Sequence, residues 1–462
     1  MNLEALLGRS DGRVFRVGLV GVGEFGRSFL SQARLVPDLS ARVACDRDVE
    51  RAAAAFRDVG LAAEEIRICD SPAAAGTALE AGQAVVVADA ELLVGLPLDV
   101  VVEATGEPGH AAAIAEAAIA AGKHVVMVTK EAESVVGPLL AHKARQAGVV
   151  HTPVDGDQPS LLIGLVAWSR LLGLEIVAAG KASEYDFVYD PAAGSVTAQG
   201  RTVALPGFGA HWSCAPSELR EAVAARAGLL AGFAHRTVPD LCEMTIVCNA
   251  TGLGVDRPAL HAPIARTLEL PDLFGAEAGG GLLSREGVVD IFNCLRRPDE
   301  LSFAGGVFVV ARTPDPVTGR LFKDKGIPVS GDDGRVLIHN PVHLLGAEAP
   351  MSVLSACRAG RSTAGEDVRP RVDLTAVADR AIAAGTRFEI GHRHEIGGLR
   401  PAMLPAAPLG AATPLPYYLL AGAVARVEIA EGAAVTAGMV EIPEDSVLHR
   451  LRREQDALFF GG

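Results

Sequence analysis

The chain of 462 residues is longer than one hydrophobic core supports, because cores stop growing near ~250–300 residues, so we expect two or three domains. Hydrophobic residues make up 49% and charged residues 21%, a composition that is typical of globular α/β proteins and excludes a disordered chain. The formal charge of −14 argues against nucleic acid or an anionic membrane surface as the main partner.

Neither a membrane span nor a disulfide framework is predicted. No stretch reaches 18 uninterrupted apolar residues, and the first residues lack the charged and apolar regions of a secretory signal. The seven cysteines are scattered and never spaced C-x-x-C, which indicates small buried hydrophobes instead of disulfides or a zinc site. We therefore expect a cytoplasmic protein with no membrane partner.

The first predicted elements are a strand, a glycine turn and a helix. Residues 14–20 (VFRVGLV) form a short apolar run, and RSFLSQARL carries helical spacing. Between them lies the G-x-G-x-x-G pattern of a dinucleotide site, with Gly21, Gly23, Glu24, Phe25 and Gly26. Gly21 permits the tight turn, Gly23 lets the backbone approach a diphosphate, and Gly26 lets helix and strand pack closely, while the helix N-terminus faces the phosphates.

The pattern alone is weakly specific, but the next strand, ARVAC, delivers Asp46 twenty residues after Gly26. An acid at this place holds the ribose hydroxyls and favours NAD by repelling a 2′-phosphate. Arg47 and Arg51 could accept that phosphate instead, so the cofactor is NADP or NAD. The alternative for Asp46 is a cap at the strand end.

Two further strand–helix units continue the pattern. Residues 98–104 (LDVVVEA) predict a buried strand that ends before Thr105 and Gly106, and KHVVMVTK predicts another that ends at Lys130. Ligands of a doubly wound sheet lie beyond the carboxyl ends of its strands. These three residues therefore indicate the nicotinamide half of the site, and the alternative for Lys130 is a solvated lysine.

Polar residues also follow two later strands. Asp155 and Asp157 come after GVVHTPV and before a helix, where they cap that helix or else bind substrate hydroxyls or relay a proton. Lys181 and Glu184 follow LEIVAAG, where the lysine suits a phosphate or a polarised carbonyl and the acid suits a proton. The alternative there is a surface loop held by its own ion pairs.

The segment DLCEMTIVCNATGL predicts an apolar helix that carries Glu243 and Asn249 as candidate substrate-binding residues. A buried carboxylate costs several kcal/mol unless it is paired or protonated, so Glu243 faces either a lysine or a pocket. His339 and His343 are four apart, but Pro341 breaks the helical spacing and no metal site is predicted. His343 is a candidate substrate contact or proton shuttle, with a core histidine as the alternative.

Two regions carry no readable chemistry. Residues 258–299 are rich in glycine, proline and charge, which predicts a lid or an extended loop. From Ser362 onward, short β runs alternate with glycine turns, which predicts a small β-rich module for packing, oligomerisation or lid duty.

As a set, the segments resemble the homoserine-dehydrogenase-like oxidoreductases with a C-terminal SAF domain, a group that includes 1-deoxy-D-xylulose 5-phosphate reductoisomerase-like enzymes. The resemblance spans nearly the whole chain and rests on GLVGVGEFG, VVEATGEPGHAA, VTKEAE, DGDQPS, GKASEYDFVYDP, EMTIVCNATGL, GGVFVVART and VEIPEDSVLHRLRREQDALF. It implies an α/β Rossmann domain with a doubly wound parallel sheet over 1–156, an α+β catalytic and dimerisation domain over 157–360, and an SAF-like β-rich domain over 361–462.

By this similarity Lys130 matches the strand-end lysine of homoserine dehydrogenases. The other cleft positions that the resemblance implies are Asp155, Asp157, Lys181, Glu184, Asn249 and His343. The chain departs from the family at HNPVHL, where an aromatic-Pro-Tyr-His-Leu phrase is expected, and this leaves the substrate open.

The expected function is NAD(P)-dependent oxidoreduction of a small polyhydroxylated or phosphorylated substrate. Lys130 or Lys181 would stabilise the oxyanion while a neighbouring acid or histidine relays the proton. In a reductoisomerase version the skeleton rearranges before reduction, and its divalent metal has only Asp155 and Asp157 as candidate ligands. The alternatives are a dehydrogenase of a hydroxy acid, amino-alcohol or sugar acid, and a non-catalytic dinucleotide sensor. We expect a homodimer or a higher homo-oligomer.

Overall fold

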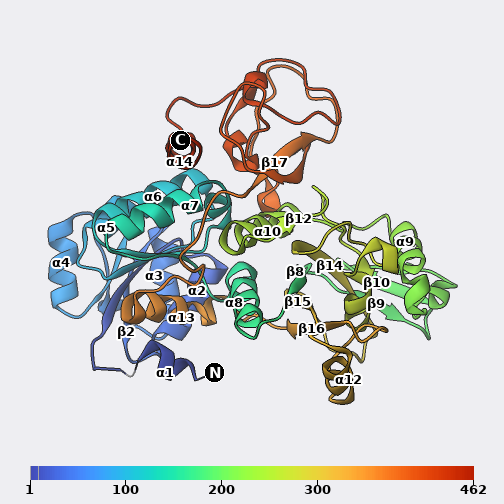
Figure 1. Ribbon diagram of the computed structural model, residues 1–462. Coiled ribbons are helices and arrows are strands. Elements are labelled where there is room, and N and C mark those ends of the chain that lie inside the picture. The colour runs from blue at the N-terminus through green and yellow to red at the C-terminus, as the bar shows by residue number, and fades with distance from the viewer. Residues whose placement is uncertain (1, 9, 462) are drawn as a thin grey trace.

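The computed structural model describes residues 2–8 and 10–461, and of His392 only the backbone. Figure 1 shows three bodies: an N-terminal one in blue and cyan, a middle one in green and yellow, and a C-terminal one in orange and red. Within the described residues, no helix is long and apolar enough to cross a membrane.

The N-terminal body is a doubly wound α/β fold, as predicted. Within the described chain its sheet has seven parallel strands in the order β3-β4-β2-β1-β5-β6-β7. Helices cover both faces, which is why strands such as AVVV and VVVE are buried along their whole length. The strands are β1 (Phe15–Val20), β2 (Leu39–Cys45), β3 (Ile66–Ile68), β4 (Ala84–Val87), β5 (Val100–Glu103), β6 (His124–Met127) and β7 (His151–Pro153).

Each helix of this body has a polar residue as its N-cap or first residue, and α2 to α7 connect successive strands. They are α1 (Leu3–Leu7), α2 (Glu24–Ala33), α3 (Val49–Asp58), α4 (Pro72–Glu80), α5 (Ala90–Gly95), α6 (Pro108–Ala120) and α7 (Lys130–Gln146). Because β1 lies between β2 and β5, the chain reverses its direction of winding at β1. A ligand crevice is expected beyond the carboxyl ends of β1 and β5.

The middle body is built on a mixed sheet in the order β11-β10-β9-β14-β8-β15-β16, with β12 and β13 also paired to β14. Its strands are β8 (Ile176–Ala182), β9 (Phe187–Asp190), β10 (Ser195–Ala198), β11 (Arg201–Ala204), β12 (Gly254–Val255), β13 (Ile264–Ala265), β14 (Val288–Arg296), β15 (Val307–Arg312) and β16 (Arg335–Asn340). Its helices are α8 (Gln158–Leu171), α9 (Leu219–Leu229), α10 (Val238–Thr251), α11 (Leu270–Leu273) and α12 (Pro316–Asp324).

The prediction of a lid or extended loop over residues 258–299 is wrong for its last part. Strand β14 occupies the centre of the middle sheet, and eight of its nine residues are buried. The run VVDIFNCL is short and flanked by glycine and charged residues, so the composition of the wider window concealed it. Its strand character comes from parallel pairing with β8, about 110 residues earlier in the chain.

The C-terminal body is small and β-rich, as predicted, and the segments on either side of it return to the N-terminal body. Helix α13 (Ala349–Leu354) lies beside α2 in Figure 1. Strands β17 (Val372–Ala378) and β18 (Leu399–Pro405) form one antiparallel pair, and β19 (Val424–Ala425) and β20 (Val440–Glu441) form another.

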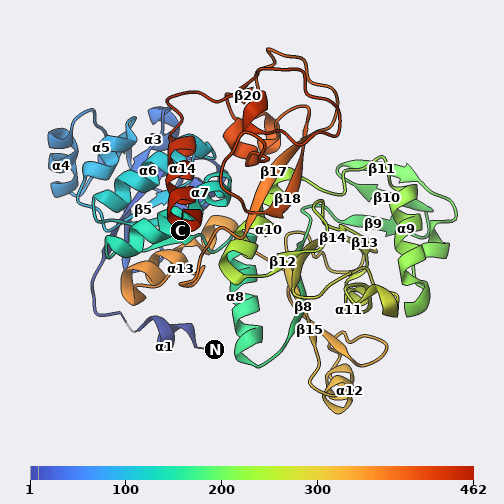
Figure 2. The ribbon, with the colours of Figure 1, turned by 45° about the horizontal axis from the view of Figure 1, so that its top comes forward.

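The last helix, α14 (Val447–Phe460), lies across α6 and α7 (Figure 2). Gln455 fixes this contact, because its Oε1 accepts a hydrogen bond from Leu139 N (3.1 Å) and its Nε2 donates one to Val135 O (2.9 Å). These two groups of α7 would bond each other in a regular helix, so Gln455 inserts into the ladder next to Pro138. The C-terminal body is thereby held against the N-terminal body.

Candidate functional site

The glycine turn after β1 has the geometry of a diphosphate cradle. Gly21 has φ +89°, and a Cβ there would collide with the carbonyl oxygen of Ala104 at the end of β5. A Cβ on Gly26 would lie 2.5 Å from Gly21 O, so α2 could not approach β1 with a larger residue. No atom lies within 4 Å of a Cβ built on Gly23, which leaves open space in front of the α2 N-terminus. Exposed backbone N–H groups beside open space suit a dinucleotide diphosphate.

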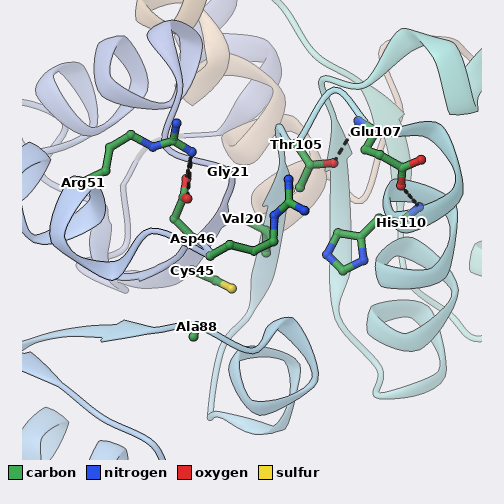
Figure 3. Close-up of a pocket in the computed structure, with 10 residues that line it drawn as sticks. Val20, Gly21, Cys45, Asp46, Arg51, Ala88, Thr105, Glu107 and His110 are labelled. Atoms are coloured by element: carbon green, nitrogen blue, oxygen red, sulfur yellow. Dashed lines mark hydrogen bonds and ion pairs between the residues drawn. The ribbon is translucent and has the colours of Figure 1, made fainter. Parts of the chain in front are cut away.

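A cavity of about 310 Å³ opens beside this turn (Figure 3). Its lining comprises Val20, Gly21, Cys45, Asp46, Arg47, Arg51, Ala88, Thr105, Glu107 and His110. It lies at the carboxyl ends of β1, β2 and β5, where the adenosine half of a dinucleotide binds in folds of this kind.

The Asp46 carboxylate in this cavity is already engaged. It accepts hydrogen bonds from Val22 N (2.9 Å) and Asp48 N (3.0 Å), and Arg51 Nη2 donates to its two oxygens at 2.7 and 2.6 Å. Burial works to raise the pKa of Asp46, but these hydrogen bonds, above all that of Arg51, hold it below its usual value. Asp46 is therefore a neutralised anion, whereas the Arg51 side chain remains 47% exposed.

Beyond β5, Thr105 is held by a buried acid that the sequence analysis did not single out. Glu103 is fully buried, and its Oε1 accepts hydrogen bonds from Thr105 N (2.8 Å) and Thr105 Oγ1 (2.5 Å). Gly106 N donates to Thr129 Oγ1 at 2.9 Å, which ties the ends of β5 and β6 together. Burial raises the pKa of Glu103 to about 7. The available signal was an acid directly after the apolar run VVV.

Lys130, the first residue of α7, meets the middle body in a network of buried charges. Its Nζ forms a short contact with Glu243 Oε1 and lies 3.9 Å from Asp157 Oδ2. Lys181 Nζ lies 2.5 Å from the other Glu243 oxygen and 3.0 Å from Asp240 Oδ1. Glu243 thus bridges two ammonium groups. Of the two alternatives for this acid on an apolar helix, a lysine or a pocket, the structure shows lysines.

The two lysines differ in their access to solvent. The Lys130 side chain is 20% exposed, whereas that of Lys181 has no exposure. Burial acts against both ammonium groups, but the carboxylates of Asp157 and Glu243 raise the pKa of Lys130 well above its usual value. Glu243 and Asp240 likewise raise the pKa of Lys181. Although burial would raise it, the two lysines lower the pKa of Glu243 to about 2, so all three groups are charged at neutral pH.

A second cavity, of about 210 Å³, brings the three bodies together around Lys130. The N-terminal body supplies Phe25, Ala104, Gly106, Val128, Thr129, Lys130 and Glu131, the following segments supply Gly156, Asp157 and Leu345, and the C-terminal body supplies His394. Burial raises the pKa of Asp157, which Lys130 counteracts. Glu131 and His394 were not singled out from the sequence; Glu131 adjoins Lys130 in α7, whereas only the fold brings His394 here.

Three predicted site residues have other surroundings. Asp155 accepts hydrogen bonds from Ser160 Oγ (2.5 Å) and Ser352 Oγ (3.1 Å), and burial raises its pKa. Glu184 is exposed on the turn between β8 and β9. His343 packs over Gly305 beside Gln158, next to the helix that Asp157 caps.

Asn249 has a structural task in place of the predicted substrate contact. Its Oδ1 accepts from Arg371 N (2.8 Å) and Val372 N (2.9 Å), and its Nδ2 donates to Val372 O (3.2 Å). These bonds anchor the start of β17 on α10. The Asn249 amide is therefore engaged in attaching the C-terminal body to the middle body.

The described residues 2–8 and 10–461 contain no group of three or more His, Cys, Asp or Glu side chains arranged to hold a metal ion. Asp155 and Asp157, the two candidate ligands, have separate partners: serine hydroxyls for the first and Lys130 for the second.

Two regions of the chain match known protein families. Residues 21–153 match the NAD-binding domain of homoserine dehydrogenase, and residues 156–349 match the catalytic domain of oxidoreductase DRL. These matches show an NAD-binding domain followed by an oxidoreductase catalytic domain. The first match ends at Pro153 and the second begins at Gly156, which lines the cavity that contains Lys130 and Asp157. Residues 350–462 of the oxidoreductase lie outside both matches.

No curated protein matches the oxidoreductase in sequence. Among solved structures, it is similar to myo-inositol dehydrogenase from Lactobacillus casei in complex with NAD(H) and myo-inositol (19% identity, 38% of this chain, 47% of that chain, TM-score 0.29). It is also similar to a levoglucosan dehydrogenase in complex with NADH and levoglucosan (20% identity, 39% and 45%, TM-score 0.28). A probable dehydrogenase from Thermotoga maritima gives 10% identity, 75% and 90% coverage, and a TM-score of 0.39. The chain spans about half the length of the first two structures.

Proposed function

We propose that this oxidoreductase transfers a hydride between NADP and a carbonyl or carbinol carbon of a small polyhydroxylated or phosphorylated substrate. The observation that supports this most directly is Lys130, a partly exposed ammonium in the cavity where the three bodies meet, anchored from behind by Glu243. When bound, the nicotinamide supplies the hydride acceptor or donor. The protein itself must stabilise the charge on the substrate oxygen and accept or donate its proton.

Lys130 is suited to stabilise charge on the substrate oxygen. Because Asp157 and Glu243 raise its pKa despite burial, the ammonium keeps its proton at neutral pH and acts as a fixed positive group. A cation preorganised in a partly buried site stabilises a developing oxyanion more strongly than one in bulk water. Lys130 is thus the electrostatic group of the site and not its base.

Lys181 acts through Glu243 as a positioning residue. It is fully buried, so it cannot touch a substrate, and its bond to Glu243 fixes the carboxylate that in turn fixes Lys130. Asp240 is itself held by Thr237 Oγ1 (2.8 Å) and Ser183 Oγ (3.1 Å). The network keeps the Lys130 ammonium in one place, which is what positioning for catalysis requires.

The preference for NADP over NAD rests on the first cavity. The negative charge of Asp46 is offset by Arg51, while Arg47 and Arg51 both line the space beside it. A 2′-phosphate would meet two guanidinium groups there, and guanidinium–phosphate pairs are among the strong charge-assisted hydrogen bonds.

The polar groups in the lining of the second cavity favour a hydroxyl-rich substrate. Thr129, Lys130 and Asp157 supply donors and acceptors around about 210 Å³, a volume that suits a small molecule. We further propose the cytoplasm as the compartment, because the seven cysteines, all among the described residues, are free thiols. A homodimer is supported by β11, an edge strand of the middle sheet whose four residues are all exposed, and light scattering tests this state.

The test is oxidation of NADPH and NADH with a panel of ketoses, ketose phosphates and keto acids. Lys130→Met should lower kcat by ~10²–10³-fold while the binding of NADPH stays within threefold, because the charge acts on the reacting oxygen. The matched control is Lys325→Met, which removes an exposed lysine of the middle body. Turnover that survives Lys130→Met refutes the assignment. Mass analysis of the product separates simple reduction from reduction preceded by a skeletal rearrangement.

A further inference from the structure

The C-terminal body contributes a histidine to the cavity around Lys130. The turn η8 (His392–His394) lies between β17 and β18 and packs on α10, the helix that carries Glu243. From this turn His394 lines the same cavity as Lys130 and Asp157. A Cβ on Gly106 would lie 3.2 Å from His394 Cε1, so the imidazole lies directly against the loop after β5.

His394 is paired with a buried carboxylate. Its Nδ1 lies 3.2 Å from Glu131 Oε1, and the Glu131 side chain is 2% exposed. Burial raises the pKa of Glu131 to about 7, and Lys130 opposes this rise. A carboxylate this close to Nδ1 of a histidine attracts its N–H group and favours the tautomer whose other nitrogen can accept a proton.

The backbone of the turn is held in an unusual conformation. Arg393 (φ 60°, ψ 27°) and His394 (φ 59°) are both in the left-handed region, which residues other than glycine enter only when their surroundings require it. The Arg393 guanidinium lies over the Tyr185 ring, 5.6 Å from its centroid, and Tyr185 belongs to the turn after β8. The turn is thus fastened to both neighbouring bodies.

The proposed reaction needs a proton acceptor that the other candidates do not provide. Lys130 keeps its proton, and Lys181 has no access to the cavity. Asp155 is engaged by two serine hydroxyls. Asp157 caps α8 through Gln158 N (3.0 Å) and faces the Lys130 ammonium.

We propose that His394, oriented by Glu131, is the catalytic acid–base of this oxidoreductase, so that the C-terminal body completes the active site. The inference rests on the proposed function. In the oxidative direction the substrate O–H bond breaks and its proton moves to the imidazole. The C–H bond breaks with its electron pair, a hydride passes to the oxidised nicotinamide of NADP, and the carbon–oxygen double bond forms. Reduction reverses each transfer.

The groups that set the proton affinity of this imidazole come from several elements. Glu131 and Lys130 belong to α7, Asp157 precedes α8, and Arg393 and Glu395 adjoin His394 in the chain. Glu131→Gln removes the carboxylate next to the His394 imidazole and leaves Lys130 and Asp157 in place. The variant should therefore change the proton affinity of the imidazole directly.

The first experiment uses the full-length protein and needs no substrate. In the ¹H–¹⁵N spectrum of the histidine imidazoles, the signal lost in His394→Asn is that of His394. Adding NADPH should shift this signal, and Glu131→Gln should shift its Nδ1 resonance in the free protein. A signal that responds to neither change overturns the proposal, because the imidazole would then lie away from both the carboxylate and the cofactor.

The second experiment measures rates with the substrate found in the panel. His394→Asn and the bulkier His394→Gln should each lower kcat at least ~100-fold and remove the rise of the oxidation rate with pH, while NADPH binding and the unfolding midpoint stay as in the natural protein. His449→Asn, a half-buried histidine of α14, is the matched control and should retain the activity.

The outcomes separate this inference from the proposed function. If NADPH binds and Lys130→Met is inactive but His394→Asn is active, the histidine assignment is wrong and the oxidoreductase assignment stands. If Asp157→Asn removes the pH-dependent rise and His394→Asn leaves it, Asp157 is the proton acceptor and the proposal is overturned. If neither coenzyme binds, the proposed function fails and this inference fails with it.

Discussion

Replacing Arg51 by alanine should reverse the coenzyme preference, and the structure gives the size of the effect. Arg51 holds Asp46 through contacts of 2.7 and 2.6 Å, lines the first cavity and has a side chain that is 47% exposed. The variant removes a charge-assisted hydrogen bond to the 2′-phosphate, about 1.5–3 kcal/mol, and frees a carboxylate whose repulsion at ~4 Å adds about 1 kcal/mol in water. The sum of about 2.5–4 kcal/mol corresponds to a roughly 60- to 700-fold weaker binding of NADPH.

NADH should respond differently to the same change. The freed Asp46 carboxylate can accept hydrogen bonds from the ribose hydroxyls, so the dissociation constant of NADH should fall or stay within threefold. Fluorescence titration of both coenzymes at one fixed ionic strength measures the two constants. The matched control is Arg57→Ala, which removes an exposed arginine of the same helix. Equal losses for NADPH and NADH, or a natural protein that prefers NADH, would refute this account of the cavity.

Three further predictions concern the turn and the buried acids. Gly21→Ala, at φ +89° and against Ala104 O, should weaken NADPH binding more than ~10-fold by calorimetry, and unchanged affinity would contradict the tight turn. Since burial raises the pKa of Glu103 to about 7, the contribution of this side chain to stability is complete below about pH 4.5 and is lost as the pH rises through 7. At pH 8, but not at pH 4.5, Glu103→Gln should therefore unfold at a higher urea concentration than the natural protein. Since the lysines lower the pKa of Glu243 to about 2, the contribution of this carboxylate to stability is present above about pH 4.5 and is lost as the pH falls toward 2. Glu243→Gln should lower the free energy of unfolding in urea by about 3–5 kcal/mol at pH 7, because it leaves Lys181 with Asp240 alone. A loss of the same size at pH 2 would contradict the pairing.

The N-terminal fold was predictable because its signals are local. The run VFRVGLV, the glycine turn and the helix after it follow one another within about twenty residues, and the structure places β1 at Phe15–Val20 and α2 at Glu24–Ala33. Parallel strands covered on both faces need continuous apolar runs, and such runs are visible in the sequence. The middle body was less accessible, since β14 depends on β8 for its pairing and on distant helices for its burial.

Some polar residues of the site could be identified from the sequence, and others could not. Lys130 and Asp157 were found because each follows an apolar strand, and both line the second cavity. Asn249 was found by its polarity on an apolar helix, but its hydrogen bonds hold the chain at Val372. The sequence around His394 gives no signal of a functional site, since it predicts only a turn in a β-rich module.

The sequence by itself determined that a dinucleotide-binding turn opens the chain and that polar groups follow the ends of its strands, because backbone conformation and strand burial are written in neighbouring residues. Only the tertiary structure decided which charges meet. Lys130 and Glu243 are 113 residues apart, and His394 is 263 positions after Glu131. Ion pairs of this kind form between elements that the packing of three bodies brings together, and no periodicity within one element encodes that packing.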